Sequence, residues 1–226
     1  ASVEQDLHAL LQAAGESAPY VMVGASMGGL YVRSYQADYP EEVVGLVLVD
    51  PSSEDRLFTM YEGSPVLIAM LTTSQLRATL PRLPVAVLRR APQTGAPFDL
   101  LPPASYELRV KLDRRLIASV PDTLTPEFIA EFRETERARL ARLLQLRARN
   151  AAPLGDRPTV VLSRGIESGA ELQATHAALA GLSTNARHTV VPGAGHEIHL
   201  FEPIAVVQAI ADVASAVRNK TRLPPR

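Results

Sequence analysis

The chain contains no cysteine, so it can hold neither a disulfide nor a thiolate metal site. Its 23 lysines and arginines nearly balance its 24 aspartates and glutamates, so nothing points to nucleic acid or an anionic membrane as a partner. No apolar run approaches the roughly 18 residues that a membrane-spanning helix needs. The five histidines are not spaced with carboxylates as metal ligands are, and we expect no metal and no cofactor.

What is present is the composition of a folded globular protein. Hydrophobic residues make up 46% of the 226 positions and charged residues 21%, which argues against wholesale disorder. This length suits one sizeable core, or a core with a small inserted subdomain. The first residues lack the pattern of a signal peptide and resemble the start of an ordinary helix.

Strands and helices alternate near the start of the chain. The spacing of apolar residues predicts a helix over 3–14, a buried strand over 20–23 and a further helix that stops before Pro40. Residues 43–49 are nearly all apolar and rich in β-branched side chains, as in a strand covered on both faces. A strand, a helix and a second strand with short connections predict the βαβ unit of a parallel sheet, and hence an α/β fold.

This order breaks over residues 51–157. Prolines are frequent there and separate short apolar or helical pieces. The clearest helix of this region runs from Pro126 to about Asn150, and we interpret its many charges as a solvated face. We therefore predict that residues 51–157 form a mainly helical cap or lid, inserted into the α/β core.

Core elements return after the insertion. Strands are expected at 159–162 and 188–191, with a helix at 170–180 between them. A last amphipathic helix follows the second of these strands. The core thus comprises residues 1–50 and 158–226.

The sequence Gly24-Ala25-Ser26-Met27-Gly28 matches G-x-S-x-G and lies between a predicted strand and a predicted helix. A sharp turn there holds the Ser26 hydroxyl out at the carboxyl edge of the sheet, and we expect strained backbone angles at this serine. Both Gly24 and Gly28 are expected to be required, because side chains would collide with the strand and the helix. The N–H of Met27 is positioned to donate to an oxyanion. The alternative is a glycine-rich turn with an incidental serine.

A serine needs a base to become a good nucleophile. His196 ends the sequence Pro-Gly-Ala-Gly-His, directly after the last predicted strand. Glycines allow that loop to fold back over the sheet edge, so that the imidazole can reach Ser26. The alternative is a surface histidine. We expect Ser26 Oγ and His196 Nε2 to lie within hydrogen-bond reach, or somewhat further apart when no ligand is bound.

Together these motifs resemble the α/β-hydrolase family. The resemblance rests on a strand followed by GASMGG and a helix, a strand that ends in Asp50-Pro51, an insertion, and GAGH before the last helix. It covers nearly the whole chain outside the cap. It implies the C-terminal half of an α/β-hydrolase sheet, with Ser26 as nucleophile and His196 as base.

The resemblance leaves open which acid orients His196. In much of the family the acid follows the strand after the cap, where this chain offers only Glu167. In dehalogenase-like members the acid ends the strand after the nucleophile helix, where Asp50 stands, and we favour Asp50. Glu54 and Asp55 are further candidates. Asp50 also has a purely structural interpretation, as a residue that caps the next turn.

Two features depart from the family pattern. Ala25 precedes the serine where many relatives have histidine, which leaves the motif intact. The family's first four strands, and the loop that donates the second oxyanion N–H, have no counterpart in this chain. The strand at 20–23 would then be a bare edge, which is a template for pairing and aggregation. We expect a companion N-terminal segment or chain that completes the sheet.

A serine nucleophile favours acyl chemistry and disfavours dehalogenase and epoxide-hydrolase reactions, which need a carboxylate nucleophile. Ser26 would attack an acyl carbonyl while His196 takes its proton, and water would then release the acyl group. An apolar cap suits small to medium lipophilic esters or lactones. The alternatives are carbon–carbon or peroxide chemistry on the same triad, or a non-hydrolytic small-molecule receptor on the same fold. The apolar cap residues are Val66, Leu67, Ile68, Met70, Leu71, Phe98, Leu100 and Leu101.

Overall fold

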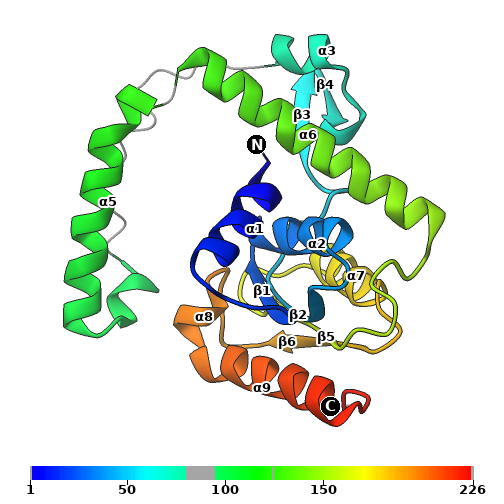
Figure 1. Ribbon diagram of the computed structural model, residues 1–226. Helices are drawn as coiled ribbons and strands as arrows, with labels where there is room; N and C mark the ends of the chain where they lie inside the picture. The colour runs from blue at the N-terminus through cyan, green and yellow to red at the C-terminus, as the bar shows by residue number, and fades with distance from the viewer. Residues whose placement is uncertain (1, 80–94, 124, 225–226) are drawn as a thin grey trace. The chain divides into compact units, whose positions relative to one another are not determined.

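The computed structural model describes residues 2–79, 95–123 and 125–224 (Figure 1). No helix in these ranges is both long enough and apolar enough to cross a membrane. The helices, 3-10 turns (η) and strands are, in chain order, α1 (Val3–Ala13), β1 (Tyr20–Ala25), α2 (Gly28–Asp38), β2 (Val43–Val49), β3 (Phe58–Tyr61), β4 (Ser64–Leu67), η1 (Ile68–Met70), α3 (Thr73–Ala78), η2 (Phe98–Leu100), α5 (Pro103–Thr123), α6 (Pro126–Arg149), β5 (Thr159–Arg164), α7 (Ala170–Ala180), β6 (Ala186–Val191), α8 (Ile198–Phe201) and α9 (Pro203–Asn219).

The chain divides into two compact units. We call residues 1–57 with 139–226 the core unit, and residues 58–138 the inserted unit. Leu140, just past the second boundary, is 1% exposed and is part of the core unit. The cap predicted at 51–157 stays a prediction, and a part of it lies outside the described residues.

The core unit is built on a four-stranded sheet in the order β1-β2-β5-β6. Each neighbouring pair of strands is parallel. The predicted α/β fold class is thus confirmed, as are the strands expected at 20–23, 43–49, 159–162 and 188–191. β2 is buried almost along its whole length, in agreement with its unbroken apolar sequence.

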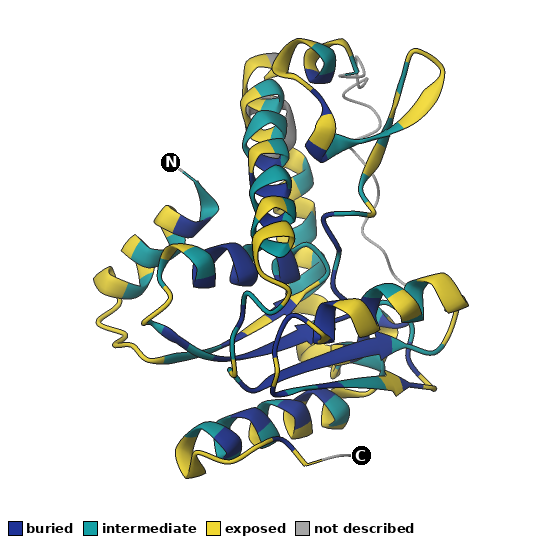
Figure 2. Cartoon of the chain, turned by 90° about the vertical axis from the view of Figure 1, so that its right-hand side faces the viewer, coloured by how far each residue is buried: buried dark blue, intermediate teal, exposed yellow. Residues whose placement is uncertain are grey.

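Helices cover both faces of this sheet. Along β2, Leu46 and Leu48 pack in one cluster with residues of α2 and α7, while Val47 and Val49 pack in a second cluster with residues of α8 and α9. This division follows from the two-residue period of a strand, which turns successive side chains to opposite faces. Figure 2 shows buried residues in the sheet strands and, between more exposed ones, in the helices.

β1 lies at one end of the four-stranded sheet. Among the described residues it pairs with β2 alone, so the bare edge expected from the sequence is present in this part of the chain. Val23 on this strand is 43% exposed. An edge of this kind presents unpaired backbone N–H and C=O groups to any further strand.

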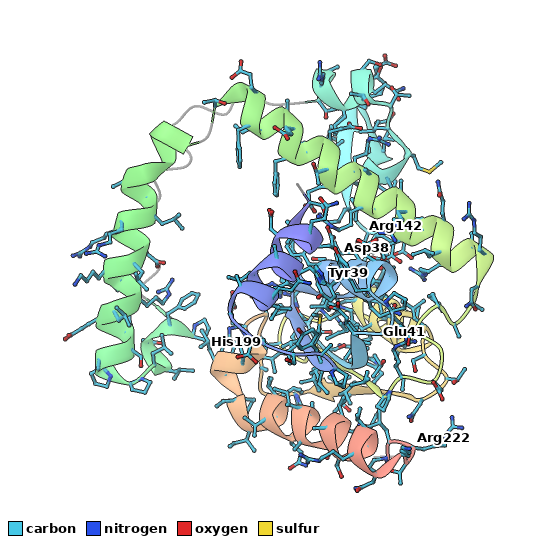
Figure 3. All side chains as sticks on the ribbon, in the orientation of Figure 1. Asp38, Tyr39, Glu41, Arg142, His199 and Arg222 are labelled. Atoms are coloured by element: carbon cyan, nitrogen blue, oxygen red, sulfur yellow. The ribbon has the colours of Figure 1, made fainter. Side chains whose placement is uncertain are left out.

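The second half of α6 is tied to the core unit by arginine ion pairs. The interpretation of this helix's charges as a solvated face is therefore wrong for this half. Arg139 is 4% exposed and its partner Glu4 is 3% exposed. Burial raises the pKa of Glu4, but hydrogen bonds and the charge of Arg139 outweigh it and bring the pKa to about 2. Arg142 Nη1 lies 2.5 Å from Asp38 Oδ1 (Figure 3). The pairs are Arg139 with Glu4, Arg142 with Asp38 and Arg147 with Glu54.

The inserted unit contains a β-hairpin that the sequence analysis did not anticipate. β3 and β4 pair antiparallel around Glu62 and Gly63, whose φ angles are 50° and 79°. Two positive φ angles in a two-residue loop mark a type I′ turn, which fits the twist of a hairpin. The other elements that the structure describes wholly within this unit are helical. The unit exposes many large apolar side chains: Phe58, Met60, Met70, Leu100, Leu108, Leu112, Leu116, Phe128 and Phe132.

Candidate active site

Ser26 lies in a strained turn between β1 and α2. Its φ angle is 52°, a left-handed conformation that costs a residue with a side chain about 1–3 kcal/mol. Backbone hydrogen bonds fix this geometry, because Ser26 N–H donates to the carbonyl of Val49 at 3.1 Å. The carbonyl of Ser26 in turn accepts from the N–H groups of Gly29 at 3.0 Å and Ser52 at 2.9 Å. The strained backbone expected at this serine is present.

Two glycines make this turn sterically possible, but they are not the two that the motif indicated. A Cβ on Gly24 would lie 2.4 Å from the carbonyl oxygen of Gly28, so Gly24 is required as expected. The expectation for Gly28 is wrong, since a Cβ there would meet no atom within 4 Å among the described residues. A Cβ on Gly29 would lie 2.6 Å from Cβ of Pro51. The second required glycine is therefore Gly29, where α2 approaches the end of β2.

Met27 precedes the first residue of α2 and has helical backbone angles, with φ −57° and ψ −28°. Within the described part of the chain, its N–H has no hydrogen-bond partner. A helix N-terminus carries such free donors together with a partial positive charge. The Met27 N–H is thus available to an incoming anionic oxygen.

His196 and Asp50 meet at the carboxyl edge of the sheet. His196 Nδ1 lies 2.6 Å from Asp50 Oδ2, and the Asp50 side chain is 3% exposed. The backbone N–H of Arg164 donates to Asp50 Oδ1 at 3.0 Å. An ionised carboxylate only accepts hydrogen bonds, so Nδ1 carries a proton, and in a neutral ring Nε2 is then the acceptor. This is the tautomer that a general base requires.

The other acids considered for this role lie elsewhere. Glu167 is exposed, and no hydrogen bond joins it to His196 in the part of the chain that the structure describes. Glu54 is 0% exposed and is paired with Arg33 and Arg147. Burial raises the pKa of Glu54, but the two guanidinium charges outweigh it and bring the pKa to about 2.

Asp55 is also engaged outside this site. Arg147 Nη1 lies 3.2 Å from Asp55 Oδ2, and the Ser53 hydroxyl donates to Asp55 Oδ1 at 2.5 Å. Of the candidate acids, Asp50 is the one in contact with His196.

Ser26 Oγ makes no hydrogen bond with His196 in the described residues. Both residues are partly exposed at the same edge of the sheet, because β1 and β6 are parallel strands that end there. Nucleophile and base are often further apart without a ligand than in the reacting complex. The close approach of these two side chains stays a prediction.

A buried polar cluster next to Asp50 was missed by the sequence analysis. Ser163 Oγ lies 2.6 Å from His176 Nδ1 and 2.6 Å from His188 Nε2. His176 Nε2 lies 2.9 Å from the carbonyl oxygen of Pro51, and both Ser163 and His176 are 0% exposed. The sequence carries one weak signal of this cluster, a histidine within a helix that is otherwise largely apolar.

These two histidines predict a loss of stability in mild acid. Burial lowers the pKa of His176 and of His188 below the usual value of about 6.5. As the pH falls through about 6.5, the unfolded chain binds protons that the folded protein does not. The free energy of unfolding should then decrease by up to about 1.4 kcal/mol per pH unit for each histidine.

Urea unfolding of the wild type and of His188→Gln, between about pH 5 and pH 8, measures this slope. The variant should lose part of the wild-type slope, because Gln does not titrate. The exposed His199 provides the control, since His199→Gln should keep the full slope (Figure 3). Equal slopes for wild type and His188→Gln would contradict the assignment.

Comparison with known proteins gives a clear family match. A family model described as alpha/beta hydrolase fold matches residues 1–203. No curated protein sequence matches the chain. A thermophilic esterase from Thermogutta terrifontis is similar in structure, with a TM-score of 0.56 and 21% identity over 96% of this chain and 73% of the esterase. Est816, an N-acyl homoserine lactone degrading enzyme, has a TM-score of 0.50 and 18% identity over 92% of this chain and 72% of its own.

At such identities the structural likeness shows the fold alone. The family match is stronger, because it spans most of the chain, including the strand–GASMGG–helix turn and the loop that carries His196. The parallel sheet with helices on both faces agrees with it. The chain therefore belongs to the α/β-hydrolase family.

Proposed function

We propose that the protein is a serine hydrolase that cleaves carboxylic esters or lactones through an acyl-enzyme on Ser26. The observation that carries this proposal is the 2.6 Å contact between His196 Nδ1 and Asp50 Oδ2, at the sheet edge where the Ser26 turn also lies. An imidazole fixed in this tautomer is suited to take a proton from a serine hydroxyl. In this proposal Ser26, His196 and Asp50 act as nucleophile, base and orienting acid.

The reaction follows from these roles. Ser26 Oγ attacks the acyl carbonyl while its proton passes to His196 Nε2, and the Met27 N–H stabilises the oxyanion. His196 then gives the proton to the departing alkoxide, which leaves as the alcohol. A water molecule, deprotonated by His196, attacks the acyl-enzyme and releases the carboxylic acid. The proton returns from His196 to Ser26 Oγ, which restores the free enzyme.

Small to medium lipophilic substrates fit best with the composition of the inserted unit. Met70 is 72% exposed and Leu100 is 58% exposed, and both belong to the apolar set identified from the sequence. Large exposed apolar side chains commonly mark surfaces that bind ligands or partners. The ester and lactone chemistry named for two structural relatives agrees with this substrate class.

Labelling with a fluorophosphonate probe tests the proposed nucleophile. The full-length protein should react once per chain, and mass spectrometry of the digested protein should locate the label on Ser26. A panel of p-nitrophenyl esters of increasing acyl length should then show turnover with a preference for short to medium chains. No label and no turnover would contradict the hydrolase proposal and favour a non-hydrolytic receptor on this fold.

We also propose that a companion N-terminal segment or chain pairs with β1 and completes the sheet. The unpaired outer edge of β1 and the 43% exposure of Val23 support this proposal. In the proposed complex the companion supplies the second oxyanion donor. Its effect would be to remove an edge that otherwise templates aggregation.

Expression of residues 1–226 alone tests the companion proposal. The isolated chain should aggregate, unfold without a cooperative transition and show little esterase activity. Val23→Lys should reduce the aggregation, because a charge on an edge strand opposes strand addition. A cooperative calorimetric transition with full activity would show that this chain needs no companion.

A further inference from the structure

The polar cluster beside the proposed acid has a defined direction of hydrogen bonding. The carbonyl of Pro51 can only accept, so His176 Nε2 carries a proton and donates it at 2.9 Å. In the neutral ring Nδ1 is then an acceptor, and it receives the hydroxyl proton of Ser163 at 2.6 Å. The Ser163 oxygen in turn accepts from His188 Nε2 at 2.6 Å. The series of hydrogen bonds thus runs from His188 on β6 to Ser163 on β5, then to His176 on α7, and ends at the Pro51 carbonyl.

Pro51 directly follows Asp50, whose φ angle is 43°. A left-handed backbone at an aspartate is unfavourable and persists only where the surroundings hold it. The N–H of Asp50 donates to the carbonyl of Leu162 at 2.8 Å, which fixes the residue on one side. The His176–Pro51 hydrogen bond fixes the peptide on the other side.

The same turn is coupled to the nucleophile. The N–H of Ser52 donates to the carbonyl of Ser26 at 2.9 Å. Gly29 on α2 approaches Pro51 so closely that an added Cβ would lie 2.6 Å from Cβ of Pro51. A shift of the Pro51 peptide would therefore change the position of the proposed acid relative to the nucleophile turn.

We propose that His176 is a positioning residue for the Asp50–His196 pair, acting through the Pro51 carbonyl. This role rests on the proposed function, because it concerns the orientation of the proposed base. His176 Nδ1 lies 3.8 Å from Asp50 Oδ1, beyond hydrogen-bond distance, and its own hydrogen bonds go to Ser163 and Pro51. We therefore assign its positioning effect on the acid to the backbone hydrogen bond with Pro51. His176 keeps the carboxylate in the one place where it meets His196 Nδ1.

A matched pair of amide substitutions separates this role from simple packing. In His176→Gln the side-chain amide can reach the place of Nε2 and donate to Pro51. In His176→Asn the shorter amide takes the place of Nδ1, so it meets Ser163 and leaves the Pro51 carbonyl without its donor. Both variants carry the same neutral amide and differ in where it lies, so a lower activity of His176→Asn than of His176→Gln reports the loss of the Pro51 hydrogen bond.

The first readout is kinetic and uses the full-length protein. Sites are counted by fluorophosphonate titration run to completion, so that misfolded molecules are excluded. His176→Asn should lower kcat per site by about 10- to 100-fold, as is typical when a hydrogen-bond partner that orients a site residue is removed. KM should change less than twofold, because His176 contacts no substrate in this proposal. His176→Gln should recover most of kcat, and His199→Gln should match the wild type.

The second readout is spectroscopic and does not depend on activity. The proton between His196 Nδ1 and Asp50 Oδ2, which lie 2.6 Å apart, should give a far-downfield proton NMR resonance. This resonance should be weakened or lost in His176→Asn and present in His176→Gln and His199→Gln. It would decide the positioning role even if the protein hydrolysed no ester. Equal kcat and equal resonances in His176→Asn and His176→Gln would overturn the proposal.

Discussion

Replacement of Ser26 by alanine should lower the turnover of a p-nitrophenyl ester by about four to six orders of magnitude. The substitution removes the proposed nucleophile while the turn and the Met27 donor stay in place. The thermal midpoint should hardly move. Ser26 Oγ makes no hydrogen bond among the described residues, and alanine meets the same backbone strain at a φ angle of 52°.

Turnover of Ser26→Ala is measured in the full-length protein beside fluorophosphonate labelling and a calorimetric scan. Ser74, an exposed serine in the inserted unit, provides the matched control. Ser74→Ala should keep wild-type activity and labelling. Ester turnover that survives Ser26→Ala would mean that a different group is the nucleophile. His196 would then not be the base that activates Ser26.

Replacement of Asp50 by asparagine should lower kcat by about four orders of magnitude. The asparagine amide can donate a hydrogen bond to Nδ1 of His196, which favours the tautomer with its proton on Nε2. In that tautomer Nε2 has no lone pair left to take the serine proton. Asparagine is nearly isosteric and keeps an oxygen for the Arg164 N–H, which now donates to Asp50 Oδ1 at 3.0 Å. The fold should therefore survive, as judged by circular dichroism.

Glu167→Gln is the matched comparison for Asp50→Asn. Glu167 is exposed, and its φ angle of 52° is close to the 43° of Asp50. Both changes therefore replace an acid in a similar backbone conformation. Because no hydrogen bond joins Glu167 to His196 among the described residues, Glu167→Gln should keep kcat within about twofold of wild type. If Glu167→Gln proved to be the damaging change and Asp50→Asn the mild one, Asp50 would not be the orienting acid.

Much of the core unit could be predicted because its signals are local. The run at 20–23 is apolar, the run at 43–49 is apolar and rich in β-branched residues, and each is a strand in the structure. The helix expected at 170–180 coincides with α7. Such patterns depend on the periods of strand and helix, so a few neighbouring residues suffice to read them.

The inserted unit, and the helix α6 that continues from it into the core unit, were harder to predict, since their signals were weak or ambiguous. Glu62 and Gly63 form the hairpin turn, but glutamate is not among the residues that usually occupy the first position of a type I′ turn. The charges of α6 looked like those of a solvated helix, because the sequence contains no sign of which arginine faces a partner. Arg139 finds that partner in Glu4, which is 135 residues away along the chain.

By itself the sequence determined the parallel α/β core, the serine at a strand–helix turn and the histidine in a glycine-rich loop. Only the tertiary structure decided which acid meets that histidine, since Asp50 and His196 are 146 residues apart. It also decided that Gly29 rather than Gly28 is needed, and that Glu54 is bound to arginines. The physical reason is the range of the interactions. Turn conformation and strand periodicity are set by adjacent residues, whereas hydrogen bonds, ion pairs and close packing act over a few ångströms between segments that only folding brings together.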